Sequence, residues 1–402
     1  MPTADVVVVG AGPAGVAAAV TLARAGRAVV VVDRARFPRD KVCGDGLTTG
    51  ALRLLEHLGL DPRAVPSWQR VEDVVVRGPT GHEVTFPLPR GGTYAAVARR
   101  RDLDAALVEQ ARAAGAEVLD GHACGGAVEH ADGVTLAVDG LGDLSAPYVV
   151  AADGMWSPVR RHLGLHPPGY RGEWHAFRQY LARVGSRAAS ELMVWFEPDL
   201  VPGYAWSFPL PGGRANVGFG IQRGGTGPRV GEMATLWPAL LARPHVRSFL
   251  GPDARPEAPH RAWPIPARVD RVALTGRRTL FVGDAAAATD PLTGEGIGQA
   301  LLTGMLAAQA LLAHPRDPVE ATAAYRGAVR RALVADHRLS RVLIGAVRHR
   351  RGVRAGLRLA GATEWTRRSF GRWLFEDYPR GLLLTPRRWR PGALHGPAPY
   401  RA

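Results

Sequence analysis

Cysteine and lysine are almost missing from this chain of 402 residues. Its two cysteines, Cys43 and Cys124, are too few to staple a chain of this length and exclude a cysteine-rich metal site, so we expect no bound metal. Lys41 is the single lysine among basic positions that are otherwise arginine or histidine. A lone ammonium is either a chance survivor or a residue kept for its chemistry.

Apolar runs long enough to span a bilayer are also missing. The nearest candidate, residues 296–312, ends before His314 and Arg316, whereas a span needs about 18–20 apolar residues. The N-terminus shows no basic region followed by an apolar region and a cleavage site, so no secretory signal is expected. We therefore expect a cytoplasmic protein.

Acidic residues are scarce in the last part of the chain, which carries most of the net charge of +15. From Arg341 onward there are fourteen arginines and three acidic residues. Such a region can meet nucleic acid, an anionic membrane surface or only water. No known nucleic-acid-binding module accompanies the charge, so we expect no nucleic-acid partner. Two interpretations stay open, a peripheral contact with the inner face of the cell membrane and a solvated surface.

Short apolar runs alternate with helical patterns in the first part of the chain. Residues 4–9 and 27–32 read as buried strands on either side of an alanine-rich helix over residues 16–25. A further helix over residues 101–114 precedes another strand-like run. This rhythm predicts a parallel, doubly wound sheet.

Other segments have a different composition. Residues 71–87 and 192–221 are rich in β-branched and aromatic residues broken by proline and glycine, which predicts a separate and more antiparallel sheet. From residue 296 onward the chain is mainly helical. A length of 402 residues is long for one hydrophobic core, so two packed lobes are the natural expectation.

The turn after the first strand has the pattern of a dinucleotide-binding loop. Gly10 permits the tight turn, Gly12 lets a pyrophosphate approach the backbone, and Gly15 lets helix and strand pack closely. Asp33 ends the next strand, at the spacing expected for a carboxylate on the adenosine ribose. A plain glycine turn with an acidic surface residue is the alternative, but the position between strand and helix favours a dinucleotide.

NAD and FAD share this loop, and later motifs decide between them. One strand leads into Asp153 and Gly154, and another leads into Gly283 and Asp284. A glycine-rich loop over residues 291–298 then opens a helix, and such a loop can present N–H groups to a flavin ring. Together these motifs resemble the para-hydroxybenzoate hydroxylase-like group of FAD enzymes. The resemblance implies FAD as the cofactor.

Within that group the chain resembles the geranylgeranyl reductase family. Residues 38–46 match the family's cysteine-glycine turn near the flavin, and residues 202–209 match its Y-x-W-x-F-P strand, which lines a lipid pocket. Residues 216–220 and 375–380 add to the resemblance. It implies an FAD-dependent reductase that hydrogenates isoprenoid C=C bonds of a polyprenyl substrate, such as a geranylgeranyl group, a polyprenyl phosphate or the tail of menaquinone.

The fold implied is α/β, with a Rossmann-like FAD-binding domain, an interleaved and mostly antiparallel substrate domain, and a helical C-terminal region. We predict the following boundaries: FAD-binding domain 1–70, 98–165 and 271–330; substrate domain 71–97 and 166–270; helical, arginine-rich region 331–402.

The resemblance also assigns FAD contacts residue by residue. Arg100 is included because residues 100–104 fit the family's R-x-x-L-D, although Arg99 and Arg101 leave the register open by one residue. Ribose-binding members often have glutamate where this chain has Asp33. The implied FAD contacts, glycine loop included, are Gly10, Gly12, Ala14, Gly15, Asp33, Cys43, Gly44, Gly46, Arg100, Ala123, Asp284, Gly296 and Ile297.

Aromatic residues gather on two neighbouring strand-like segments. Tyr204, Trp206 and Phe208 alternate along one strand and therefore share a face. With Trp195 and Phe219 they form the predicted substrate pocket, and ordinary core packing is the alternative. A pocket of this kind keeps an alkene dry against the flavin.

Three residues are candidates for catalysis, namely Cys43, Tyr204 and Trp206. A thiol with a pKa of roughly 8.5 is mostly protonated at neutral pH. Cys43 is therefore either the proton donor to the second alkene carbon or a residue packed beside the flavin.

The source of electrons stays open. No second glycine loop follows a strand, so a separate NADPH-binding domain is not expected, and the reductant is either NAD(P)H in transient contact or an electron-donor protein such as ferredoxin. A second enzyme interpretation is an aromatic monooxygenase (hydroxylase) or a halogenase of the same fold. Halogenases of the tryptophan type need a catalytic lysine well downstream of the glycine loop, whereas Lys41 lies inside the cysteine-glycine segment.

Overall fold

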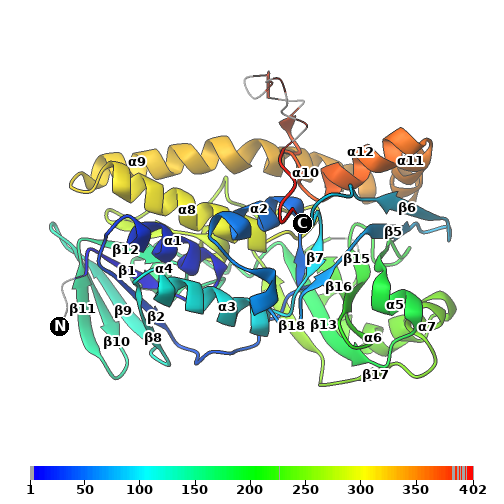
Figure 1. The fold of residues 1–402 in the computed structure, drawn as a ribbon, viewed down its shortest axis with the longest axis horizontal. Coiled ribbons are helices and arrows are strands. Elements are labelled where there is room, and N and C mark those ends of the chain that lie inside the picture. Colours follow the sequence, from blue (N-terminus) through cyan, green and yellow to red (C-terminus); the bar gives the residue numbers. More distant parts are fainter. Residues whose placement is uncertain are drawn as a thin grey trace.

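A five-stranded parallel sheet forms one end of the molecule (Figure 1). The computed structural model describes residues 4–225, 227–382, 385–386, 389, 391, 394 and 396–401. Strands buried on both faces read as unbroken apolar runs, and the four valines of β1 follow this rule. The strand order is β19-β12-β1-β2-β8. The bounds are β1 Val6–Val9, β2 Val29–Asp33, β8 Glu117–Asp120, β12 Tyr148–Ala151 and β19 Thr279–Phe281.

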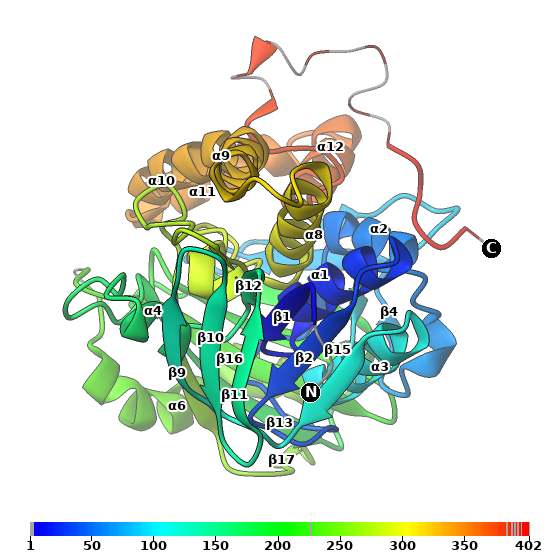
Figure 2. The ribbon, with the colours of Figure 1, turned by 90° about the vertical axis from the view of Figure 1, so that its left-hand side faces the viewer.

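Helices and a small sheet cover this parallel sheet. Figure 2 shows α1 and α8 together on one side of it and strands β9–β11 toward the other. A Cβ added to Gly304 of α8 would lie 2.1 Å from the carbonyl oxygen of Ala14 in α1, so the two helices touch backbone to backbone. The bounds are α1 Pro13–Arg24, α3 Arg100–Ala113, α8 Ile297–Ala313, β9 Cys124–Glu129, β10 Val134–Val138 and β11 Gly142–Ala146.

An eight-stranded sheet forms the other end of the molecule. Its path is β17-β13-β16-β15-β14-β5-β6, with β18 added beside β13, and β14–β5 is its parallel pair. The other pairs are antiparallel. The bounds are β5 Asp73–Arg77, β6 Glu83–Pro87, β13 Trp174–Ala182, β14 Leu192–Trp195, β15 Tyr204–Leu210, β16 Arg214–Gln222, β17 Arg255–Pro256 and β18 Arg261–Ile265.

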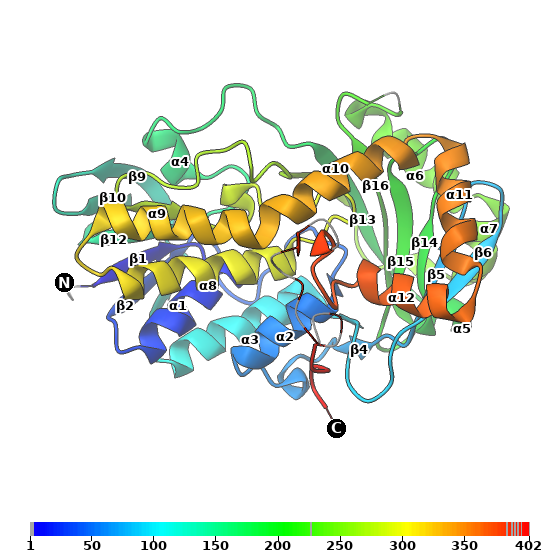
Figure 3. The ribbon, with the colours of Figure 1, turned by 90° about the horizontal axis from the view of Figure 1, so that it is seen from above.

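Helices pack on both faces of the eight-stranded sheet. The short helices α5, α6 and α7 form a closed core with one face. Helices α11 and α12 cover the other face, and Figure 3 shows how α9 and α10 lead toward them from the parallel sheet. A π-helical turn, Arg330–Val334, joins α9 to α10. The bounds are α5 Ser186–Ser190, α6 Met233–Leu241, α7 Pro244–Leu250, α9 Pro318–Val329, α10 Ala335–Val347, α11 Arg350–Gly361 and α12 Glu364–Leu374.

A third, three-stranded sheet with order β3-β7-β4 completes the fold. The chain after α12 returns to helix α2, where the Thr49 N–H donates to the Phe375 carbonyl over 2.8 Å and Arg53 pairs with Asp377. The remaining bounds are β3 Gly46–Leu47, β4 Gln69–Arg70, β7 Ala96–Val97, α2 Thr49–His57, α4 Pro158–His162, and the 3-10 turns Pro62–Ala64, Val230–Glu232 and Gly283–Ala286.

The predicted α/β fold, with its parallel sheet, antiparallel sheet and helical C-terminal region, is confirmed. Helix α1 begins at Pro13 and not at residue 16, because proline is favoured in the first turn of a helix. The domain boundaries stay a prediction. Arg387, Arg388 and Arg390 of the basic region lie outside the described residues. Within those residues no helix combines the length and apolar character needed to cross a membrane.

Candidate active site

One large cavity joins the two sheets. Its volume is about 1050 Å³. One end touches the glycine turn after β1, and the other end, here called the chamber, lies between strands β14 and β15 and helices α10–α12. All predicted FAD contacts except Gly15 line this cavity.

The glycine turn has the backbone shape that a dinucleotide needs. Gly10 has a φ of +103°, and a Cβ there would lie 2.3 Å from the Ala152 carbonyl oxygen. A Cβ on Gly15 would lie 1.8 Å from the Gly10 carbonyl oxygen, so Gly15 serves the contact of helix with turn. No side chain caps the first turn of α1, whose N–H groups have no partner within the helix. These groups adjoin the cavity and fit a pyrophosphate.

Asp33 is held in place by the backbone around it. Its carboxylate accepts from the Ala11 N–H over 2.7 Å and from the Ala35 N–H over 2.8 Å. Each carboxylate oxygen has lone pairs for a second donor. Asp33 therefore places a fixed negative charge at the edge of the cavity, where a ribose hydroxyl of a bound dinucleotide can reach it.

Asp284 and Lys41 form an ion pair on the wall of the cavity. Asp284 lies in the 3-10 turn after β19, and its Oδ2 is 3.8 Å from the Lys41 Nζ. The Lys41 ammonium also lies 4.3 Å from the centre of the Trp263 ring. Burial lowers the pKa of Lys41 to about 8, although Asp284 opposes the shift. The single lysine is thus a cavity residue that can release a proton near neutral pH.

Arg100 lines the cavity from the first turn of α3. Its guanidinium forms a bidentate pair with Asp104, with N–O distances of 2.7 and 2.8 Å. Arg99 instead pairs with Glu257 over 2.7 Å, and Arg101 is exposed. Of the three successive arginines, Arg100 alone borders the cavity.

The turn that contains Cys43 joins the two ends of the cavity. A Cβ on Gly44 or on Gly46 would lie 3.2 Å from the Phe208 ring, so these glycines let the aromatic strand pack beneath the turn. Burial raises the pKa of the Cys43 thiol, although Arg100 opposes the shift. Cys43 is therefore a neutral thiol at physiological pH.

A buried polar network fixes this turn, and the sequence prediction missed it. Asp45 has a φ of +67° and accepts from the Tyr180 hydroxyl over 2.7 Å and from Asn216 Nδ2 over 2.8 Å. Asn216 also donates to the Cys43 carbonyl and accepts from Trp206 Nε1. Burial raises the pKa of Asp45 to about 6 against the nearby Arg178. The sequence signals were the positions of Asp45 and Asn216 within two of the stretches that carry the family resemblance.

Aromatic and aliphatic side chains line the chamber. Tyr204, Trp206 and Phe208 lie on one face of β15, as the strand period predicts. The opposite wall comes from α10–α12, which the sequence did not assign to the pocket. The remaining apolar lining includes Val194, Phe196, Leu343, Val347, Val353, Leu357, Phe370, Trp373 and Leu374.

The structure does not bring Trp195 and Phe219 to the chamber. Trp195 is paired with Ala205, and Ala205 is paired with Phe219, so both aromatic residues share the face of Ala205. That face is the closed core against α5–α7. The prediction that these two residues line the pocket is therefore corrected, because successive residues of β15 point to opposite faces.

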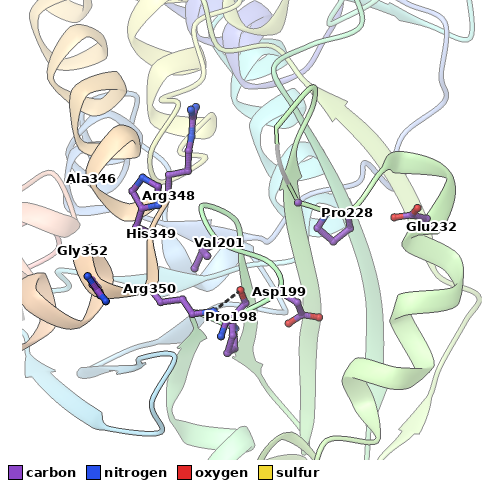
Figure 4. Close-up of a pocket in the computed structure, with 12 residues that line it drawn as sticks. Pro198, Asp199, Val201, Pro228, Glu232, Ala346, Arg348, His349, Arg350 and Gly352 are labelled. Carbon is purple, nitrogen blue, oxygen red and sulfur yellow. Dashed lines mark hydrogen bonds between the residues drawn. The ribbon is translucent and has the colours of Figure 1, made fainter.

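A second cavity of about 1150 Å³ lies at the corner between α10 and α11. It shares Ala346 and Gly352 with the first cavity. Figure 4 shows Arg350 directed at Pro198, whose carbonyl it reaches over 3.3 Å. Arg348, His349 and Arg351 also line this second cavity, as do Asp199 and Glu232. The helical corner thus has the chamber on one side and a charged surface on the other.

Comparisons with known proteins agree with this geometry. The model of the family described as FAD binding domain matches residues 3–321. A menaquinone reductase of Mycobacterium tuberculosis is 38% identical over 327 residues, which are 77% of this chain and 76% of the relative. A digeranylgeranylglycerophospholipid reductase of Methanopyrus kandleri is 34% identical over 313 residues, 76% of each chain.

Solved structures share the fold. A geranylgeranyl bacteriochlorophyll reductase-like protein from Thermoplasma acidophilum superposes with a TM-score of 0.79 at 22% identity, covering 96% of this chain and 98% of that one. An FAD complex of the halogenase PltM gives a TM-score of 0.71 at 18% identity, covering 94% of this chain and 86% of that one. At these identities the likeness establishes the fold alone.

Proposed function

This chain belongs to the FAD-binding-domain family, and on that premise we propose that it is an FAD-dependent reductase that hydrogenates C=C bonds in a polyprenyl chain. Its relatives are named as reductases of menaquinone and of a digeranylgeranyl lipid. Both molecules carry polyprenyl chains, so the proposed substrate class is a lipophilic isoprenoid and the setting is lipid metabolism.

The observation that carries this proposal is the continuity of the cavity. A dinucleotide-shaped end runs without interruption into an apolar chamber. Apolar walls suit a hydrocarbon substrate and exclude water from a hydride transfer. The Cys43 turn stands between the two ends, where an alkene would meet the cofactor.

Bound reduced FAD supplies the hydride for such a reduction. The chain's own residues hold the alkene and manage the proton. The Tyr204 hydroxyl donates to the Thr293 carbonyl, and Trp206 Nε1 donates to Asn216 over 3.1 Å. Because these hydrogens are engaged, we assign the two rings to positioning of the alkene. Cys43 keeps its thiol proton and is the candidate donor at the cofactor end.

An anaerobic reaction tests the function. The purified yellow protein is reduced with dithionite, mixed with geranylgeranyl diphosphate or menaquinone, and followed by flavin absorbance and product mass. We expect reoxidation together with a gain of two hydrogens per reduced bond. Flavin that stays reduced until oxygen is admitted, followed by hydroxylation or halogenation of an aromatic compound, would assign the chain to the monooxygenases or halogenases.

A matched pair of variants ties the reaction to the chamber. Val194 lines the chamber from β14, and Val128 is a valine of β9 with 57% of its surface exposed. We expect Val194→Trp to fill the chamber and stop lipid reduction while FAD binding persists. Val128→Trp should retain both. Equal activity in the two variants would argue against the chamber as the lipid site.

The reductant is a separate question with two candidates, NAD(P)H and an electron-donor protein such as ferredoxin. Rapid mixing of the oxidised protein with NADPH distinguishes them. Bleaching of the flavin at a rate that supports turnover identifies a nicotinamide donor. Bleaching that requires a reduced ferredoxin identifies a protein donor.

We also propose that helix α11, together with its corners with α10 and α12, meets an anionic membrane, at the inner face of the cell membrane. Leu359 and Trp365 each expose 74% of their surface among arginines of α11 and α12. Apolar and basic groups in one surface suit the interface of an anionic bilayer, and Val353 and Leu357 of the same helix line the chamber. Sedimentation with anionic vesicles at physiological salt, compared with neutral vesicles, tests the contact. If equal amounts of protein sediment with anionic and with neutral vesicles, the proposed membrane contact is wrong.

A further inference from the structure

Three carboxyl groups and one guanidinium lie together beside the cofactor end, all of them buried except that of Glu376, whose side chain is 16% exposed. Arg380, from the segment after α12, and Asp290 each expose only 1% of their side chains. Arg380 lies 2.5 Å from Asp290 and 2.8 Å from Glu376. Glu295, in the loop that leads into α8, is also buried. The cluster therefore holds more acidic than basic groups.

The negative charge of Asp290 receives more hydrogen bonds than that of either glutamate. Its carboxylate accepts from the Leu292 and Thr293 N–H groups, from the Thr293 hydroxyl, and from Ser340 on α10 over 2.8 Å. Burial works to raise the pKa of Asp290, but Arg380 and these donors keep it below its ordinary value. Asp290 is therefore the ionised partner of Arg380.

Glu295 and Glu376 are supported less well. Glu295 accepts from the Gly298 N–H over 2.6 Å. Glu376 accepts from Gln299 over 3.1 Å and from Thr48 over 3.4 Å, and it shares Arg380 with Asp290. Burial raises the pKa of both glutamates. The negative charge of Glu376 raises that of Glu295 further, while Arg380 lowers that of Glu376.

Within the described part of the chain, the neighbouring elements do not supply the missing positive charge. From α10, Asp336 acts to raise the pKa of Glu376, and burial lowers the pKa of His337 so that it stays neutral. From β15, the Tyr204 hydroxyl is bonded to the Thr293 carbonyl. Two like charges cannot both be held in such a site. One proton must therefore remain on the glutamate pair at neutral pH.

The pair lies where a reduction consumes protons. Glu295 and Thr48 line the cavity, and so do Gly294 and Gly296 on either side of Glu295. We propose that Glu295 and Glu376 share one proton and store it for the alkene reduction. This inference rests on the proposed function.

Atoms and electrons balance as follows. Each C=C bond takes up one hydride, which carries both electrons and comes from bound reduced FAD, and one proton. The Cys43 thiol delivers that proton to the alkene and regains it from the glutamate pair. The π bond breaks and two C–H bonds form. A solvent proton then restores the pair, and the reductant of the proposed function restores the cofactor.

Infrared spectra of the FAD-loaded protein without substrate test the shared proton. We expect the C=O band of a protonated carboxylic acid, shifted in heavy water, to persist above pH 6. Asp45 and Asp153, with raised pKa values of about 6 each, are by then losing their protons. The band should disappear in Glu295→Gln and equally in Glu376→Gln, because the glutamate that is left ionises against Arg380.

Glu197→Gln is the matched control. Glu197 is a buried glutamate with two basic partners, Arg243 and His245, and this substitution should leave the band intact. A wild-type spectrum without the band, or a band that survives in both cluster variants, would overturn the proposal. A band lost in only one variant would identify a single buried acid and would equally overturn the sharing.

Measurements of turnover distinguish a proton-storing role of the two glutamates from a purely structural role. Loss of general acid-base help typically costs roughly 100-fold or more, so we expect Glu376→Gln to lower alkene reduction by about that factor and to change its pH profile, with FAD content unchanged. Glu376→Asp should recover part of the rate. Unchanged rate and pH profile in both glutamine variants would overturn the store.

The two proposals fail in different ways. A wild-type protein that shows the band but reduces no polyprenyl chain would overturn the proposed function, and with it the use of the proton, while the shared proton stands. A wild-type protein that reduces the lipid but lacks the band would overturn the present inference alone. If either glutamine variant does not fold, its alanine counterpart, which also lacks the carboxyl group, provides the same spectroscopic test.

Discussion

The two ends of the cavity are built in different ways. At the cofactor end the determining features belong to the backbone, such as the positive φ of Gly10 and the uncapped first turn of α1. At the chamber end they are side-chain volumes supplied by a sheet face and three helices. A backbone shape tolerates few residue types, whereas a volume can be filled in many ways. The cofactor end can therefore be recognised in the sequence by a motif, whereas the chamber shows only as a segment rich in apolar and aromatic residues.

Two glycines test how strictly the backbone shape of the cofactor end limits the residue type. A Cβ would be crowded at Gly10 and free of contacts at Gly26. We expect Gly10→Ala to abolish FAD binding, because the new Cβ would lie 2.3 Å from the Ala152 carbonyl oxygen. Gly26 has a φ of +77° with nothing near its Cβ position, so Gly26→Ala should keep FAD and cost about 1–3 kcal/mol from strain alone. FAD titration and urea unfolding measure both. Normal FAD affinity in Gly10→Ala would show that the cofactor end does not depend on backbone shape in the way described.

Two neighbouring aromatic residues test the tolerance of the chamber end. Trp195 faces the closed core and Phe196 faces the chamber. Trp195→Ala should lower the free energy of unfolding by about 3–5 kcal/mol. Phe196→Ala should cost about 1 kcal/mol, because its side chain is only partly buried, and it should shift the preferred substrate toward bulkier chains. Similar losses of stability would mean that the chamber face is as closed as the core.

Asp45 tests the junction between the two ends through pH. Its pKa is raised from 3.8 to about 6 by burial, so its contribution to stability is fully present below pH 3.8 and is lost as the pH rises through about 6. Asp45→Asn should remove about 1–3 kcal/mol of that pH dependence, and asparagine tolerates the positive φ. Urea unfolding at several pH values measures it. The same slope in wild type and variant would show that the folded protein holds Asp45 ionised.

The basic corner outside the chamber should give the smallest effect. Arg351 lies on the rim of the second cavity, and one cation near an anionic membrane is worth about 1 kcal/mol. Arg351→Ala should therefore weaken vesicle binding by roughly fivefold. Arg101→Ala removes an equally exposed charge from α3 and is the control. If both variants lose vesicle binding equally, the binding depends on the net charge of the protein and not on this corner.

The cofactor end could be predicted from the sequence because its requirements are local. Gly10, Gly12 and Asp33 belong to one strand-turn-helix-strand unit, and each is needed for a reason that can be read from its neighbours. The alternation of Tyr204, Trp206 and Phe208 was also local. All three lie on the predicted face.

What could not be predicted depends on distant contacts. The prediction for Trp195 and Phe219 was wrong because the pairing register between strands decides which face each side chain occupies. The sequence of a single strand does not reveal that register. Asp45 and Asn216 are 171 residues apart in the chain, and their bond follows from the packing of the two sheets. The late helices of the chamber wall carry no spacing that points to the site.

The tie between the last segment and helix α2 bears on how the protein is made. When synthesis on the ribosome has just passed β19, every strand of both sheets exists, but α10–α12 and the ion pair of Asp377 with Arg53 do not. Until those helices emerge, the aromatic face of β15 is open to solvent and prone to association. The nascent chain thus closes the chamber last, and a slow final stage of translation is when it would most need a chaperone nearby.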